Sequence, residues 1–183
     1  MDSGITNTAG TRILRRGGTR LDFAIRPCRE ADLEALEWMG LHTPHREIIR
    51  NAFERHRRGD EVMLVADANG FPIGQVWVDL ARKRHQGAAL LWAVRVFPPL
   101  QNLGIGRELM AAAEDVILAH GLKRSELGVE RDNPAARRFY ERLGYRLAGR
   151  AVDNYTYVTP DGVPTRVPLD QWILSKDLAS PAP

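Results

Sequence analysis

The sequence predicts an α/β (α+β) domain built on a mixed β-sheet. Three observations support this fold class. Short β-rich segments alternate with longer segments whose apolar residues recur at helical spacing. An Asn-Gly pair at 69–70 separates two of the β-rich segments, which predicts a hairpin. An almost continuous apolar run from Ala88 to Phe97 has the composition of a central strand that is covered on both faces.

Composition is that of an ordinary globular protein. The chain has 183 residues, 44% of them hydrophobic and 27% charged, which is typical of one domain and argues against a disordered, collagenous or membrane class. No apolar run approaches the roughly 20 residues of a membrane helix, and residues 1–20 lack the apolar part of a secretory signal. We therefore expect a cytoplasmic protein with a single domain at 21–178, between a flexible N-terminal tail at 1–20 and a C-terminal tail at 179–183.

Cysteine content and charge argue against a disulfide-stabilised protein, a thiolate metal protein and a nucleic-acid-binding protein. Cys28 is the only cysteine, so neither an internal disulfide nor a thiolate metal cluster can form. The net charge of +3 arises from 26 basic and 23 acidic side chains, which is a nearly balanced surface. We expect neither nucleic acid nor a membrane as a partner.

The first half of the chain predicts two helices and a hairpin. A short alternating strand leads into apolar residues at helical spacing, which end at Gly40. A second helical stripe follows, with arginines on the opposite face. The expected elements are a strand at Phe23–Arg26, helices at Ala31–Met39 and His45–Arg57, and strands at Glu61–Ala66 and Ile73–Leu80 on either side of the Asn-Gly turn.

The second half predicts two further helices and a closing pair of strands. The apolar strand Ala88–Phe97 ends at two prolines. Asn133-Pro134 is a preferred helix start, because Asn caps the first turn and Pro suits the first helical position. The other expected elements are a helix from the glycines at 104 and 106 to about His120, a strand at Ser125–Glu130, a helix that Gly144 ends, and strands at Arg146–Val158 and Val167–Ser175.

The most informative segment is the turn between the apolar strand and the long helix. It comprises Gln101, Asn102, Leu103, Gly104, Ile105, Gly106 and Arg107. Its glycines allow a tight turn and a close approach to a ligand, and the first N–H groups of the next helix have no internal partner. Together with the helix dipole, these N–H groups form an anion site that suits a pyrophosphate. A Gly-x-Gly turn also occurs without any ligand, so this segment alone is a weak signal.

The surrounding residues give the turn its context. Two segments, separated by a helix, strongly resemble the GNAT superfamily of N-acetyltransferases. They are Val94 to Gly106 and Asn133-Pro134-Ala135-Ala136-Arg137-Arg138-Phe139-Tyr140-Glu141-Arg142-Leu143-Gly144-Tyr145. The resemblance covers Phe23 to Leu178 in element order and is specific between Leu90 and Tyr145. It implies a mostly antiparallel central sheet of about six to seven strands flanked by about four helices.

The resemblance also implies a function and a set of site residues. Acetyl-CoA would be the co-substrate, without a metal, and the acetyl group would pass directly to a primary amine of a small molecule or a protein. The backbone of Val94, Arg95 and Val96 would pair with the pantetheine arm, and 101–107 would bind the pyrophosphate. Asn133 would contact the cofactor arm, and Tyr140 would protonate the departing thiolate. Many members of the family are dimers, so a homodimer is a further expectation.

The general base is left unassigned by this comparison. A primary amine is mostly protonated at neutral pH and must lose a proton before it attacks a thioester. The strand Ala88–Phe97 carries no Glu, the residue that often serves as base in the family. The candidates are Glu130, Asp79, or an ordered water that relays protons to a more distant carboxylate.

Alternative functions remain open at this stage. The missing Glu motivates a non-catalytic acyl-CoA-binding or regulatory module of the same fold. A nucleic-acid-binding domain ranks last, because the chain has no long basic run. His42, His45 and His56 are interpreted as part of a loop and helix rather than a metal site, and Cys28 lacks an identifiable His partner for nucleophilic catalysis. The acceptor amine cannot be read from the sequence.

Overall fold

The computed structural model describes residues 21–159 and 161–178. The expected tails at 1–20 and 179–183 lie outside the described residues, and so does Pro160 in the last turn. The strands are β1 (Ala24–Pro27), β2 (Glu61–Ala68), β3 (Phe71–Asp79), β4 (Ala88–Val96), β5 (Arg124–Glu130), β6 (Arg146–Val158) and β7 (Pro164–Asp177). The α-helices are α1 (Arg46–Arg58), α2 (Ile105–Ala119) and α3 (Pro134–Arg142). Among the described residues there are also five short 3₁₀ segments, at Glu30–Asp32, Ala35–Glu37, Thr43–His45, Arg84–Gln86 and Pro98–Leu100.

In the described part of the chain, all seven strands form one sheet in the order β1-β2-β3-β4-β5-β7-β6. Every neighbouring pair is antiparallel except β4 and β5, which are parallel. The strand that reads as a nearly continuous apolar run, β4, is the fourth of the seven. The predicted mixed, mostly antiparallel α/β fold is therefore confirmed.

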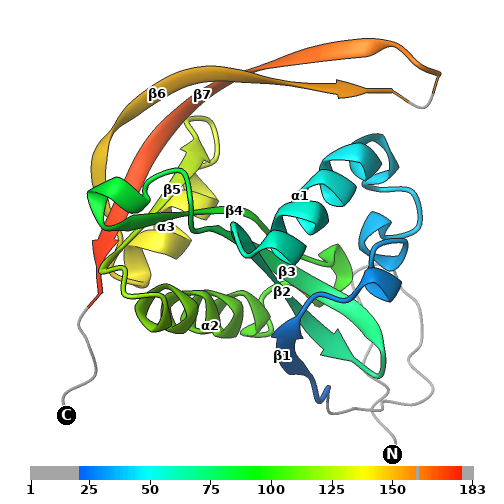
Figure 1. The fold of residues 1–183 in the computed structure, drawn as a ribbon, viewed down its shortest axis with the longest axis horizontal. Helices are drawn as coiled ribbons and strands as arrows, with labels where there is room; N and C mark the ends of the chain where they lie inside the picture. The colour runs from blue at the N-terminus through cyan, green and yellow to red at the C-terminus, as the bar shows by residue number, and fades with distance from the viewer. Residues whose placement is uncertain (1–20, 160, 179–183) are drawn as a thin grey trace, which may run out of the picture.

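The sheet separates two layers (Figure 1). Helices α2 and α3 cover one face, where the larger apolar core forms around Leu109, Met110, Val76 and Leu127. Helix α1 and the 3₁₀ segments lie on the other face over a smaller core that contains Ile49, Phe53, Met63 and Trp77. We call these the α2 face and the α1 face.

The predicted turn at 69–70 forms as expected, while the first predicted helix does not. Asn69 and Gly70 both have positive φ, of 53° and 83°, as a tight hairpin turn requires. The segment expected as a helix at Ala31–Met39 is instead two 3₁₀ turns. Side-chain hydrogen bonds pin both ends of this segment, because Asp32 accepts from the Arg29 N–H and Glu37 accepts from Arg46. These local bonds compete with a continuous helix.

Strands β6 and β7 form a long hairpin that curves beyond the rest of the sheet (Figure 1). Its far end passes over α1, and its rings contact the segment that precedes this helix: the His45 ring lies 5.1 Å from the Tyr157 ring. The hairpin thereby brings residues near 155 next to residues near 45. Within 21–159 and 161–178, none of the helices has the length and apolar character needed to cross a membrane.

Candidate functional site

The sheet opens into a fork between its two central strands. β4 and β5 pair only over Ala88–Leu91 and Arg124–Leu127. Beyond this point β4 remains paired with β3 and β5 remains paired with β7, to the ends of both strands. The edges that β4 and β5 turn toward each other in the fork therefore have no partner strand among the described residues. Unpaired backbone groups of this kind can receive an extended, amide-containing ligand.

A β-bulge lies in β4 inside the fork. Two residues of β4, Ala93 and Val94, lie opposite the single residue Val76 of β3. Ala93 has a φ of 50°, in the left-handed region that a residue with a side chain rarely adopts. A bulge bends its strand and leaves the extra residue out of the hydrogen-bonded ladder. The predicted pantetheine segment Val94–Val96 is thus placed along the fork, immediately after this bulge.

The predicted anion-binding turn connects β4 to α2. Asn102 and Gly104 have φ of 64° and 86°, and Gly104 is the N-cap of α2. The N–H groups of Arg107 and Glu108 donate to the Gly104 carbonyl, at 2.9 and 3.2 Å. The N–H groups that precede them, at Ile105 and Gly106, lie at the very start of the helix, where no helical carbonyl is available as acceptor. This geometry suits a phosphate group, and pyrophosphate binding at 101–107 stays a prediction.

Side chains around the turn divide between structural and solvent-facing positions. The Gln101 amide donates to the Val96 carbonyl at 3.2 Å, so this predicted pyrophosphate contact ties the turn back to β4. Leu103 is 58% exposed. A groove of about 560 Å³ opens beside the turn between α2 and α3. It is lined by Arg107, Met110, Ala111, Glu114, Phe139, Arg142, Leu143 and Lys176.

Tyr140 lies on the inner side of α3 and is only 8% exposed. Its ring lies 5.1 Å from that of Phe139 and 6.0 Å from that of Tyr145. Burial raises the pKa of Tyr140 to about 12, so its phenol is protonated at neutral pH. The structure gives the Tyr140 hydroxyl no hydrogen bond within the described ranges. A protonated, unused phenol is available as a hydrogen-bond donor.

Asn133 caps α3, as its place in the sequence predicted. Its Oδ1 accepts from the Ala136 N–H at 3.0 Å. The cap occupies the oxygen end of the side chain, so that a contact with a cofactor would come from its amide nitrogen.

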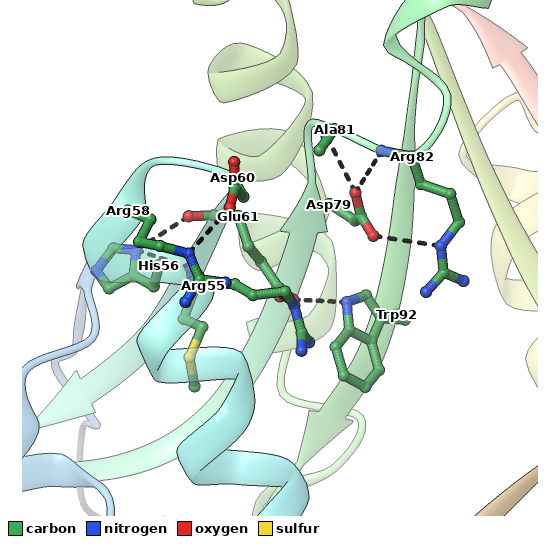
Figure 2. A network of polar contacts seen from close by, with 10 residues as sticks. Arg55, His56, Arg58, Asp60, Glu61, Asp79, Ala81, Arg82 and Trp92 are labelled. Carbon is green, nitrogen blue, oxygen red and sulfur yellow. Dashed lines mark hydrogen bonds and ion pairs between the residues drawn. The ribbon is translucent and has the colours of Figure 1, made fainter.

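The two named candidates for the general base lie at different ends of the site. Glu130 is the last residue of β5, at the mouth of the fork, and accepts from Gln171 at 3.1 Å. Asp79 ends β3 opposite Leu90, before the fork begins. One oxygen of Asp79 accepts from the N–H groups of Ala81 and Arg82, which holds a turn in place (Figure 2). The geometry favours Glu130 over Asp79.

A buried carboxylate that sequence reasoning did not single out contacts β4 from the α1 face. Glu61 is fully buried and accepts from Arg55 at 2.7 Å and from the Trp92 indole at 2.6 Å (Figure 2). Burial raises the pKa of Glu61, while Arg55 opposes this rise. Both oxygens of Glu61 are engaged, so the residue orients Trp92 at the start of the fork.

A second group missed by sequence reasoning lies on the α1 face beside the fork. We call it the basic-aromatic cluster and define it as Arg95, His42, His45, Tyr155 and Tyr157. The His45 ring lies 6.0 Å from His42 and 6.1 Å from Tyr155. Burial, followed by the charge of Arg95, lowers the pKa of His42 to about 4 and also lowers that of His45. Members of this cluster come from three separate parts of the chain, so no local sequence pattern could reveal it.

The remaining sequence candidates do not join the site. His56 contacts the backbone of β2 rather than the other two histidines. In the part of the chain that the structure describes, no group of three or more His, Cys, Asp or Glu residues could hold a metal ion. Cys28 is buried, and desolvation raises the pKa of its thiol to about 12. A thiol in this state is a poor nucleophile.

Solved acetyltransferases have the same fold. The structure of yncA from Salmonella typhimurium, solved with its cofactor acetyl-CoA, aligns with a TM-score of 0.67 and 20% identity over 88% of this chain and 97% of that chain. The PaiA N-acetyltransferase from Thermoplasma acidophilum, solved with coenzyme A, aligns with a TM-score of 0.61 and 20% identity over 86% of this chain and 99% of that chain. At these identities the similarity establishes the fold.

Sequence relatives and a family model give the assignment. Mycothiol acetyltransferases from Clavibacter michiganensis and Brachybacterium faecium are 36% and 34% identical over 92 and 97 residues, which is 50% of this chain. The match spans only 28% of the length of each relative. The model of the acetyltransferase (GNAT) family matches residues 25–145, a span that contains the fork, the turn and Tyr140. The chain therefore belongs to the GNAT family of acetyltransferases.

Proposed function

We propose that the protein is an N-acetyltransferase that uses acetyl-CoA and transfers the acetyl group directly to a primary amine. The observation that carries this proposal is the continuity of the β4 fork with the N-terminus of α2. One ligand can lie with its amide-containing arm in the fork and its pyrophosphate on the free N–H groups near Ile105 and Gly106. The unpaired backbone and the anion site follow each other in the order in which these groups occur in coenzyme A.

The residues present fit this cofactor, and each has a role that its geometry supports. Acetyl-CoA, when bound, supplies an acyl group that is activated as a thioester. Backbone groups of Val94–Val96 hold the arm, and an N–H of the bulged segment polarises the carbonyl oxygen. The turn at 101–107 holds the pyrophosphate. Arg107 and Arg142 lie beside the groove between α2 and α3 and add positive charge near the phosphates.

Tyr140 is the proposed general acid. Its phenol is protonated, buried, and positioned on the helix that Asn133 caps. Although burial raises the pKa of Tyr140 to about 12, a thiolate that leaves into the same apolar surroundings also has a raised pKa. The two groups are therefore better matched than their values in water indicate.

Glu130 is the proposed acceptor of the amine proton, directly or through one water. It is the candidate carboxylate at the mouth of the fork, and Gln171 orients it. Glu130→Gln keeps the size of the side chain and removes its basicity. We expect turnover to fall by roughly 10²- to 10⁴-fold, with little change in the affinity for acetyl-CoA. A Glu130→Gln variant with wild-type turnover would remove Glu130 from the mechanism.

The proposal as a whole is tested with the wild-type chain. Calorimetry should detect binding of acetyl-CoA. S-acetylpantetheine, which lacks the pyrophosphate and nucleotide, should bind much more weakly. Thiol release with a panel of primary amines then measures transfer. Binding without transfer to any amine would favour a non-catalytic acyl-CoA-binding module, and absence of binding would contradict the assignment of the turn.

A further inference from the structure

We propose that the acceptor is a small amine that also carries a carboxylate, as amino acids do, and that Arg95 and Gln75 bind this carboxylate. The inference rests on the proposed function and names the substrate class of the same site. It starts from two hydrogen-bond donors that lie next to each other at the fork and have no acceptor among the described residues.

The first donor is the side-chain amide of Gln75. Gln75 is fully buried in the middle of β3, on the α1 face. Its Oε1 accepts from the Trp77 indole N–H at 3.0 Å. Because an indole nitrogen only donates, this bond fixes the orientation of the amide. The Nε2 group is left buried without a partner within 21–159 and 161–178, and a buried donor of this kind is costly unless something accepts its hydrogen bond.

The second donor is the guanidinium of Arg95. Arg95 lies directly opposite Gln75 in the register of β3 and β4, so both side chains are on the same face of the sheet. Arg95 is half-buried, and the structure gives it no ion pair or side-chain hydrogen bond in the described ranges. Arg26 provides a contrast, because it is similarly enclosed but pairs with both Asp32 and Asp67. Arg95 therefore holds an uncompensated positive charge beside an uncompensated amide.

The surroundings of Arg95 also lack a negative charge. The nearby histidines are neutral at pH 7, because burial and Arg95 itself lower their pKa values. The ionisable group that favours the charged form of Arg95 is Tyr155, a phenol that carries no charge at neutral pH. All five members of the basic-aromatic cluster are half-buried, so part of each side chain is open to solvent. An anion is the missing component.

The donor set and its position specify the anion. A planar guanidinium beside an amide N–H matches the two oxygens of a carboxylate. Arg95 follows the Ala93 bulge on β4, within the segment proposed to hold the pantetheine arm and next to the bulge proposed to polarise the thioester carbonyl. A carboxylate bound to Arg95 therefore places its own molecule only a few atoms from the acetyl group. This spacing fits an amine and a carboxylate on the same small molecule, and the neighbouring Tyr155 and Tyr157 rings suit an apolar or aromatic remainder.

Binding of the acetylated product tests the inference without turnover. The probes are N-acetylglycine, N-acetylmethionine and N-acetylphenylalanine, each compared with its neutral amide by calorimetry. We expect at least one acid to bind roughly ten- to hundredfold more tightly than its amide. Arg95→Gln should abolish this difference, whereas Arg146→Gln, which removes an exposed arginine at the start of β6, should retain it. Equal binding of acids and amides, or no binding of either at millimolar concentration, would overturn the inference.

Gln75→Glu is the sharper variant, because it supplies the missing acceptor from the protein itself. One new carboxylate oxygen can keep the Trp77 bond while the other pairs with Arg95. We expect this variant to lose the preference for acids and to unfold at a temperature equal to or above that of the wild type. A large fall in unfolding temperature together with an intact preference for acids would contradict the proposed pairing of Gln75 with Arg95.

Kinetics separate this inference from the proposed function. Amino acids and their amides are compared as acceptors by thiol release, and we expect a lower KM for the acids in the wild type only. Transfer to acids and amides with equal KM would overturn the carboxylate site and leave the acetyltransferase assignment intact. If no amine accepts the acetyl group but the N-acetyl acids bind tightly, the acetyltransferase assignment would be overturned and the carboxylate site would stand.

Discussion

The two faces of the sheet are built in different ways. On the α2 face, apolar side chains from β3, β4 and β5 pack against α2 and α3, and the turn at 101–107 connects neighbouring elements. On the α1 face, polar groups such as Glu37, Glu61 and Gln75 are buried, and arginine side chains bond to both carboxylates. Under the proposed function, the α2 face would hold the acetyl-CoA and the α1 face would select the acceptor.

The largest expected effect separates two tyrosines that look alike. Tyr140→Phe should lower turnover by roughly 10²- to 10⁴-fold and leave the unfolding temperature almost unchanged, because its hydroxyl makes no bond in the described ranges. The matched control is Tyr145→Phe, which loses a 2.7 Å bond to Ser125 and should cost stability rather than turnover. Steady-state kinetics and thermal unfolding measure both. If Tyr140→Phe instead lowered stability and kept wild-type turnover, Tyr140 would be a core residue without a role in the mechanism.

The same comparison explains what the sequence could predict. The fork strand, the turn, the Asn133 cap and the Asn-Gly hairpin depend on neighbours in the chain, so local patterns reveal them. Glu61 and Gln75 looked like ordinary positions in β-rich runs, since nothing local shows that Trp92 bonds to the first or that Arg95 lies opposite the second. The cluster that joins His45 to Tyr155 depends on the reach of the β6–β7 hairpin. Pairings across a hundred residues have no local signature.

The buried ion pair on the α1 face gives the next largest effect. Arg55→Met leaves the Glu61 carboxylate buried without its cation and should destabilise the protein by about 2–4 kcal/mol. The double variant Arg55→Met, Glu61→Gln removes the charge as well and should recover a large part of this loss. Denaturant unfolding at neutral pH measures both variants. Equal stability of the single variant and the wild type would show that the pair contributes nothing.

Two carboxylates on the α1 face should respond to pH with opposite sign. Hydrogen bonds from Arg26 hold the pKa of Asp32 below its usual range, so its contribution to stability is present above the unfolded pKa and is lost as pH falls through the folded value. Burial raises the pKa of Glu61, so its contribution falls as pH rises through the folded value. Asp32→Asn should therefore flatten the acid side of a plot of unfolding temperature against pH, and Glu61→Gln should not. An unchanged acid side in Asp32→Asn would contradict the role of Arg26.

The smallest expected effect concerns the two glycines of the turn. Gly104 has a φ of 86° and open space where a Cβ would lie, so Gly104→Ala should cost about 1 kcal/mol from backbone strain alone. A Cβ at Gly106 would meet the Phe139 ring at 3.4 Å and Val96 at 3.7 Å, at ordinary helical φ. Gly106→Ala should therefore leave the turn intact and change the stability by no more than a few tenths of a kcal/mol.

If the backbone of the turn holds the pyrophosphate, calorimetry should show weaker acetyl-CoA binding in Gly104→Ala and nearly unchanged binding in Gly106→Ala. Equal losses in both variants would instead indicate that the ligand contacts the α2–α3 side of the turn, where Phe139 lies.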